Sequence, residues 1–212
     1  MVFSSVANSA LIVAPPGLNP GDPFRIIIAE VGRIDATSSN INTYDLFVQS
    51  LAVLAGLDTY NSLPVTWSAL GSTTTVSAVS RLPNSMIPIY LIDGQIVANS
   101  SNDIWSGSLL HAINLDQFGA IKTGTYWTGS DATGHGFAGQ ELGTVSGITR
   151  NGSALNSNFG WITNNFGTNI SQAQVYMYSK VLNVASVPEP STLVLLSAGF
   201  FGLCMRRRKS KG

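Results

Sequence analysis

The stretch FRIIIAEV, residues 24–31, decides the fold of this 212-residue chain. It is an almost continuous apolar run, and it follows a segment rich in turn-forming residues, 15–23. A short run of this kind, bounded by turn signals, is typical of a buried strand. We therefore predict that residues 24–31 form the first strand of the core.

A helix is predicted after this strand, because apolar residues recur there at helical spacing. Ser39, Asn40 or Asn42 could cap its start, and Gly56 would end it. The apolar positions are Ile41, Tyr44, Phe47, Val48, Leu51, Ala52, Leu54 and Ala55. This face is expected to pack into the core rather than to form a site.

Beyond the helix, short apolar segments alternate with Gly, Ser, Thr and Asn. The predicted strands are 66–72, 87–92, 95–98, 125–128, 160–162 and 175–184. A second, shorter helix is expected over residues 103–113, although Gly107 within it is unfavourable. The pattern indicates an α+β fold: a single mixed domain of short strands with one clear helix, spanning residues 15–186.

The last 26 residues have a different character, and they fall into three parts. Val187, Pro188, Glu189 and Pro190 come first; the apolar run 191–205 follows; Arg206, Arg207, Arg208 and Lys209 form a basic end. Cations that cannot cross a membrane remain on the cytoplasmic side. The run of 15 residues is shorter than the roughly 20 needed for a permanent spanning helix.

This order of parts resembles the PEP-CTERM sorting signal of exported bacterial proteins. The resemblance implies a transmembrane sorting helix within residues 187–212 and a membrane protease, exosortase, as partner. It implies export across the inner membrane, transient anchoring, and then release to the cell surface or the extracellular space. An ordinary C-terminal anchor and a buried core helix are the alternative interpretations.

Charge separates the tail from the body. The chain has 11 basic and 11 acidic residues, but five basic residues and one acidic residue lie at or beyond position 188, which leaves six basic against ten acidic. A mildly acidic body argues against nucleic acid as a partner, because phosphate binding needs clustered basic side chains. The single cysteine, Cys204, lies in the apolar run, so the body has no disulfide or thiolate site.

The N-terminus lacks the features of a complete signal peptide. Residues 1–14 contain no Lys or Arg, and their apolar stretch, 10–14, is short. We interpret residues 1–14 as a lead-in or the remnant of a signal peptide, with a start codon assigned too far downstream. A cytoplasmic protein is the alternative.

The body also resembles domains described as C-type-lectin-like or endostatin-like in other PEP-CTERM proteins. The resemblance is carried by AGL (55–57), WSALGS (67–72), PIYL (88–91), DG (93–94), DIW (103–105) and WTGS (127–130). The disulfides of the endostatin branch are absent, as are the Glu-Pro-Asn, Gln-Pro-Asp and Trp-Asn-Asp tripeptides of calcium-binding lectins. No metal or cofactor is therefore expected.

Few residues in the body offer catalytic or binding chemistry. No nucleophile elbow or phosphate-binding loop occurs. His111 is expected to be a half-buried helix residue, whereas His135 lies in a flexible loop with Asp131 four residues earlier. Any of Trp67, Trp105, Trp127 and Trp161 could stack on a sugar if exposed, although a core role is more usual. Trp105, Asp131 and His135 are therefore the candidate ligand contacts.

Three functions are compatible with these observations. The first is a non-enzymatic surface or matrix protein associated with exopolysaccharide, as the PEP-CTERM resemblance implies. The second is a secreted hydrolase of that matrix, which would need paired carboxylates such as Asp103 with Asp116 or Asp131. The third is an adhesin for a non-sugar surface such as ice, because PEP-CTERM tails also occur on proteins called ice-binding; only the run 73–75 supplies clustered threonines.

Overall fold

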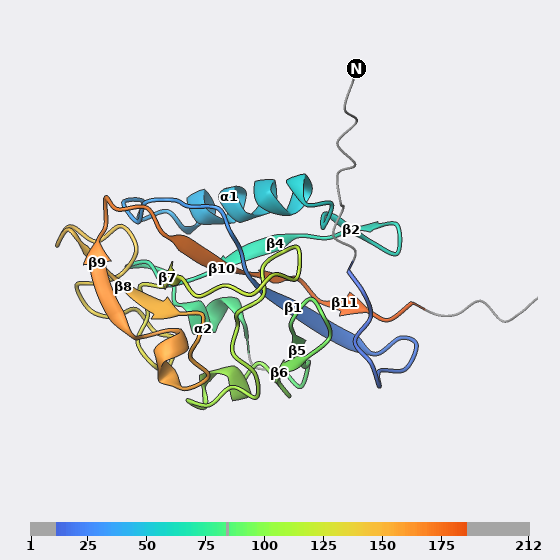
Figure 1. Ribbon diagram of the computed structural model, residues 1–212. Helices are drawn as coiled ribbons and strands as arrows, with labels where there is room; N and C mark the ends of the chain where they lie inside the picture. The colour runs from blue at the N-terminus through green and yellow to red at the C-terminus, as the bar shows by residue number, and fades with distance from the viewer. Residues whose placement is uncertain (1–11, 84, 186–212) are drawn as a thin grey trace, which may run out of the picture.

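The computed structural model describes residues 12–83 and 85–185 (Figure 1). Most of its strands join one mixed sheet, against which α1 packs. The elements are β1 (Pro23–Ala29), α1 (Ile41–Leu54), β2 (Thr59–Tyr60), β3 (Leu63–Pro64), β4 (Trp67–Leu70), α2 (Ala78–Arg81), β5 (Ile89–Tyr90), β6 (Ile96–Ala98), η1 (Asp103–Trp105), β7 (Thr125–Trp127), β8 (Ile148–Ser153), η2 (Phe159–Trp161), β9 (Asn165–Thr168), β10 (Gln174–Ser179) and β11 (Leu182–Asn183). The mixed α+β prediction is confirmed for the described residues.

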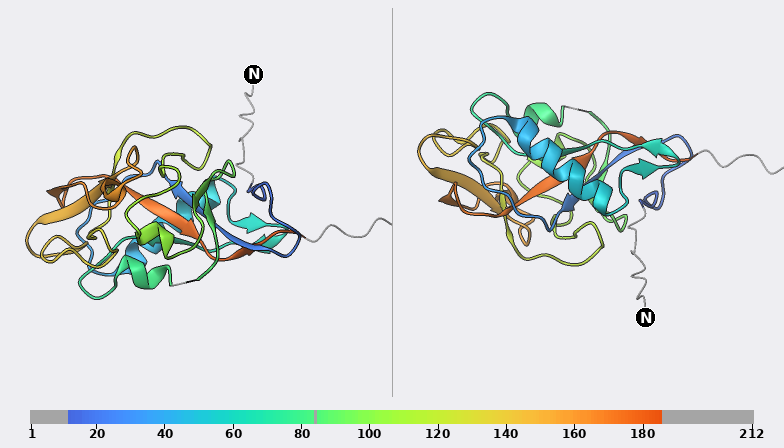
Figure 2. Two further views of the ribbon diagram at one scale, coloured as in Figure 1. Left: turned by 90° about the horizontal axis from the view of Figure 1, so that it is seen from below. Right: turned by 90° about the horizontal axis from the view of Figure 1, so that it is seen from above.

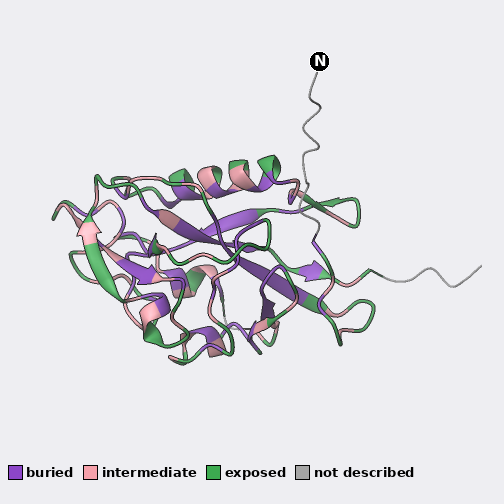
Figure 3. Cartoon of the chain, in the orientation of Figure 1, coloured by how far each residue is buried: buried purple, intermediate pink, exposed green. Residues whose placement is uncertain are grey.

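The strands β1 and β10 form the centre of the sheet. They pair antiparallel, with Ile28 opposite Met177, in the order β6-β5-β1-β10-β7-β8-β9. β4 also pairs with β10, and β11 pairs with β1. Residues 24–29 are all buried, because neighbours lie along both edges of β1 and the rest of the core covers its faces (Figure 3). The prediction of a buried first strand is confirmed.

Helix α1 covers the sheet on the side of β4 and β10, as the view from above shows (Figure 2). Its start is capped by Asn40, whose side-chain oxygen accepts the N–H of Asn42 at 3.1 Å. Gly56, at φ +71°, follows the C-cap in the left-handed conformation that glycine adopts without strain. Both predicted boundaries are confirmed, but Leu54 is 83% exposed, so its assignment to the core face was wrong.

Two side chains of α1 accept hydrogen bonds from backbone N–H groups on the outer edge of β4. The N–H of Ala69 donates to Asp45 at 2.8 Å, and the N–H of Trp67 donates to Gln49 at 2.8 Å. The spacing of the two acceptors fits that of the two donors, because residues four apart on a helix and residues two apart on a strand are both separated by about 6–7 Å. The helix thus occupies backbone donors that an edge strand would otherwise offer to another chain.

Four sequence-predicted strands, 66–72, 87–92, 95–98 and 125–128, are observed in shortened form as β4, β5, β6 and β7. The prediction for 175–184 is divided between β10 and β11.

Two other predictions are wrong. The helix expected over 103–113 is only the 3₁₀ turn η1, because Gly107 adopts φ +91° and the chain turns away. The strand expected at 160–162 is also a 3₁₀ turn, η2, which Asn158 caps by accepting the N–H of Gly160.

The strands β8 and β9 were not predicted. Their sequences, ITRNGS and NFGT, resemble turns, yet they extend the sheet beyond β7. Gly152 has a tertiary role there, because a Cβ at this position would lie 1.7 Å from the carbonyl oxygen of Trp161.

Ile12, at the start of the described chain, is buried in the core. Among the described residues, none of the helices combines the length and apolar character needed to cross a bilayer. The predicted sorting helix lies outside the described residues.

Candidate functional site

Trp105 lies at the end of η1 and is partly exposed. Its indole is tilted by 34° against the ring of Trp161, with ring centres 5.7 Å apart. The same indole also packs against the backbone of Gly134, so closely that a Cβ on residue 134 would lie 2.6 Å from the ring. The structure therefore brings Trp105 together with the loop that contains the other two sequence-predicted site residues.

That loop, residues 131–135, is closed by its own side chains. Asp131 Oδ1 accepts the N–H groups of Thr133 and His135, at 2.8 and 3.0 Å, and the hydroxyl of Thr133 at 2.7 Å. His135 Nδ1 lies 2.9 Å from the same hydroxyl. Because that hydroxyl gives its one hydrogen to Asp131, Nδ1 must carry a proton and donate. In the neutral ring, Nε2 is left as an acceptor on an exposed side chain.

Buried serine hydroxyls hold this loop against the rest of the fold. Ser130 Oγ lies 2.8 Å from Ser72 Oγ, which also accepts the N–H of Ala78 at 2.9 Å. The carbonyl of Gly134 accepts the N–H of Val79 at 2.9 Å. The loop is thus fixed in place before any ligand arrives.

The combination around Trp105 is suited to contact with a sugar. The Nε1–H of Trp105 is buried, so the indole offers a ligand its exposed ring surface and not its N–H. Phe159, 48% exposed, has its ring against Gly107, two residues beyond Trp105. An aromatic surface beside short hydroxyl and imidazole groups can hold the apolar face and the hydroxyls of a sugar together. We call Trp105, Thr133, His135 and Phe159 the Trp105 patch.

The other three tryptophans belong to the core. Trp67, Trp127 and Trp161 are each at most 2% exposed. The indole N–H groups of Trp67 and Trp127 donate to the carbonyls of Leu57 and Ile34, at 2.8 and 3.2 Å. These three rings are too deeply buried to stack on a ligand.

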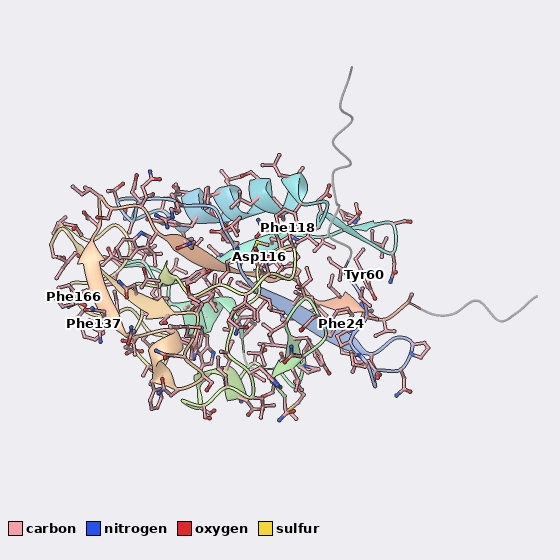
Figure 4. The ribbon with its side chains drawn as sticks, viewed as in Figure 1. Phe24, Tyr60, Asp116, Phe118, Phe137 and Phe166 are labelled. Atoms are coloured by element: carbon pink, nitrogen blue, oxygen red, sulfur yellow. The ribbon has the colours of Figure 1, made fainter. Side chains whose placement is uncertain are left out.

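A second aromatic surface, around Phe137 and Phe166, does not follow from the sequence. The guanidinium of Arg150, on β8, lies 4.5 Å from the ring centre of Phe137. The cross-strand neighbour of Arg150 on β9 is Phe166, which is 51% exposed. Thr163 accepts from Arg150 Nε at 2.7 Å. Figure 4 places Phe137 and Phe166 at the same end of the molecule. The pairing of β8 with β9, which the sequence did not indicate, creates this surface.

Two of the three acidic residues considered for hydrolysis, Asp116 and Asp131, are engaged in local structure, whereas Asp103 lies in η1. Asp116 is 2% exposed, forms an ion pair with Lys122 at 2.7 Å, and accepts the N–H groups of Phe118 and Ala120 (Figure 4). Asp131 closes its own loop, as described above. Within residues 12–83 and 85–185, no three His, Cys, Asp or Glu side chains gather closely enough to hold a metal ion.

Glu30 is a buried acid that sequence analysis did not single out. Burial raises its pKa to about 8, although it accepts the N–H groups of Gly32 and Val175. The side chain is fully buried. A carboxyl without access to solvent is suited to a structural role.

His111, expected in a helix, lies in an irregular segment and is exposed. Its Nδ1 is 2.8 Å from the carbonyl oxygen of Ile96. This bond ties the segment to β6.

Comparison with known proteins identifies the tail. The sequence model for the PEP-CTERM protein-sorting motif matches residues 186–209. This interval contains Val187, Pro188, Glu189 and Pro190 and the basic residues Arg206, Arg207, Arg208 and Lys209, all of which lie outside the described residues. The chain therefore carries the signal of an exported protein that is sorted through exosortase, a membrane protease.

A search of curated proteins finds no match to this chain. The resemblance of the body to C-type-lectin-like and endostatin-like domains remains a prediction.

Proposed function

We propose that the exported body is a non-enzymatic surface or matrix protein that binds exopolysaccharide through the Trp105 patch. The apolar run of the tail would hold it in the membrane until exosortase acts, and the body would then reach the cell surface or the extracellular space. The observation that carries the binding role is the fixed, partly exposed ring of Trp105 beside the exposed His135.

The neighbouring loop supports this proposal. The Thr133 hydroxyl donates to Asp131 and is not directed at His135 as a nucleophile would be. His135 keeps Nε2 available as an acceptor, which suits a sugar hydroxyl. Most of the polar side chains around the patch are neutral, in agreement with a carbohydrate rather than a strongly charged ligand.

Co-sedimentation of the detergent-solubilised full chain with exopolysaccharide from the producing organism tests the proposal. Binding should saturate, and Trp105→Ala should weaken it by about tenfold, the usual loss for an aromatic contact of 1–2 kcal/mol. Leu46→Ala, at an exposed apolar residue of α1, is the control and should bind normally. Runs with calcium and with chelator should agree.

Two further variants separate the ring from its polar atoms. Trp105→Phe keeps an aromatic face and should retain much of the binding, because the buried Nε1–H is out of a ligand's reach. His135→Ala removes the Nε2 acceptor, and a loss of binding there would support a ligand that uses both the ring and the imidazole. Undiminished binding of Trp105→Ala would reject the patch, and shortening of the polymer during incubation would instead favour the hydrolase.

A further inference from the structure

The described chain ends at one particular end of the molecule. β11 pairs with the start of β1, with Leu182 opposite Phe24. Val184 is still held, because its N–H donates to the carbonyl of Asp22 at 3.0 Å and its own carbonyl accepts from Gly21. In Figures 1 and 2 this end carries the β2–β3 hairpin, whereas β9 lies at the opposite end. The chain is therefore held to the body by backbone hydrogen bonds as far as Val184.

Little chain separates this point from the apolar run. Residues 185–190 precede the run that starts at position 191. Six residues of fully extended chain span at most about 20 Å, roughly the length of α1 itself. While the tail is anchored, the end of the body that carries β11 must therefore stay close to the bilayer surface.

Several side chains exposed at this end are apolar, and they lie among exposed polar residues such as Asn61, Ser62 and Asn183. Leu63, in the hairpin, is 67% exposed, and Leu54, at the end of α1, is 83% exposed. Val53 and Val181 are 52% and 39% exposed. We call Val53, Leu54, Leu63 and Val181 the exit face.

The hairpin itself is suited to an interface between water and lipid. Residues 59–64 contain no charged side chain, and the flanking charges, Asp58 and Lys180, are of opposite sign. Tyr60 packs edge-on against Phe24, with ring centres 5.7 Å apart. A shallow hollow of about 120 Å³ lies between the hairpin and β11 and includes Leu63 and Val181. Tyrosine beside apolar side chains is typical of the boundary region of a bilayer.

We infer that the exit face rests on the lipid bilayer while the tail is anchored, and that it orients the body with β9 pointing away from the membrane. This inference rests on the anchoring of the tail in the proposed function. Contact with lipid would hold the segment at positions 185–190 near the surface where a membrane protease works. Release of the tail would then leave an apolar face that binds membrane only weakly.

The test uses the full-length chain in phosphatidylcholine vesicles that contain no other protein. An environment-sensitive fluorophore is attached at Leu63→Cys, or at Leu54→Cys as a second position, in a Cys204→Ser background. Phe166→Cys, an exposed apolar position on β9, is the matched control. Brominated acyl chains should quench the label at residues 63 and 54 several-fold more strongly than the label at residue 166.

A label on the native Cys204 separates the two possible failures. Quenching at Cys204 without preferential quenching at residues 63 and 54 would overturn the inference and leave the anchoring intact. A label at Cys204 that stays in water would mean that the anchoring itself fails, and the inference with it. If the label at residue 63 were shielded from water in native membranes but not in the protein-free vesicles, its contact would be a membrane protein. That result would also overturn the inference of contact with lipid.

Discussion

The indole of Trp105 lies so close to the backbone of Gly134 that a Cβ at residue 134 would stand 2.6 Å from ring carbon Cζ3. Gly134 also adopts φ +78°, a conformation that side chains with a Cβ rarely adopt. The position of the ring and the shape of the loop therefore depend on each other.

Replacement of Gly134 by alanine should separate these two constraints. Gly134→Ala should lower the free energy of unfolding by about 2–4 kcal/mol, because it combines backbone strain with a clash against a packed ring. Gly139→Ala is the matched control, since Gly139 has φ +75° and no atom within 4 Å of an added Cβ, and it should cost only about 1 kcal/mol. Urea unfolding followed by tryptophan fluorescence measures both. Equal losses would show that Trp105 does not press on the loop.

The Trp105 patch illustrates what could be predicted from the sequence. Trp105, Asp131 and His135 were selected because each lies in a polar, turn-rich segment, and the structure does bring Trp105 against the loop of the other two. The sequence did not indicate this contact. It depends on Gly134, which reads locally as an ordinary turn glycine.

The same limit applies to the fold. Residues 24–29 and α1 follow from local periodicity, because their apolar residues alone define a strand and a helix face. β8 and β9 owe their structure to pairing with β7 and with each other, through residues such as Arg150 and Asn151 that favour no strand on their own. Phe137, Arg150 and Phe166 were missed for this reason.

Two tyrosines of β10 should respond oppositely to loss of the hydroxyl. Tyr176 is fully buried, stacks on Tyr126 at 4.3 Å, and has a hydroxyl without a hydrogen-bond partner. Tyr176→Phe should therefore leave stability unchanged or raise it by up to about 1 kcal/mol. Tyr178→Phe should destabilise by about 1–2 kcal/mol, because the Tyr178 hydroxyl donates to the carbonyl of Arg81 at 2.8 Å. Thermal unfolding measures both changes in stability. A clear loss of stability for Tyr176→Phe would mean that the Tyr176 hydroxyl makes a hydrogen bond in solution, for example to a buried water molecule.

The contact between α1 and the edge of β4 makes a further prediction. Asp45 accepts the N–H of Ala69 and pairs with Arg81, and both ionised side chains are largely buried. Asp45→Leu should cost about 2–4 kcal/mol, since it leaves the N–H of Ala69 without an acceptor and Arg81 without its counter-charge, although Arg81 Nε still donates to the carbonyl of Ala69 at 3.1 Å. Asp45→Asn keeps an acceptor for Ala69 and should cost about half as much.

The open edge should also change how the protein associates. Analytical ultracentrifugation should detect self-association of Asp45→Leu at concentrations at which the parent chain and Asp45→Asn stay monodisperse, because the N–H of Ala69 on β4 would lose its acceptor. Identical sedimentation of all three chains would mean that Gln49 alone is enough to protect the edge.

Glu30 should make the fold less stable as pH rises. Burial raises the pKa of this carboxyl from 4.5 to about 8, so between these values the folded chain holds a proton that the unfolded chain has released. The unfolding free energy therefore falls with increasing pH, and the stability linked to Glu30 is complete below about pH 4.5 and lost as pH passes through about 8. The full shift corresponds to at most about 4–5 kcal/mol. Glu30→Gln removes the titration, but its amide nitrogen cannot accept one of the two backbone N–H groups, so it should be about 1 kcal/mol less stable than the parent at pH 5 and more stable than the parent at pH 9.

Urea unfolding across this range measures the slope, and Glu141→Gln, at a carboxylate that is only partly buried, is the matched control. If the unfolding free energy of Glu30→Gln fell with pH as steeply as that of the parent, a group other than Glu30 would bind the proton. A flattened slope for Glu30→Gln alone would assign the loss of stability to this one acid. It would also mean that an acidic extracellular matrix favours the folded body, because protonation of Glu30 removes a buried charge from the junction of β1, β7 and β10.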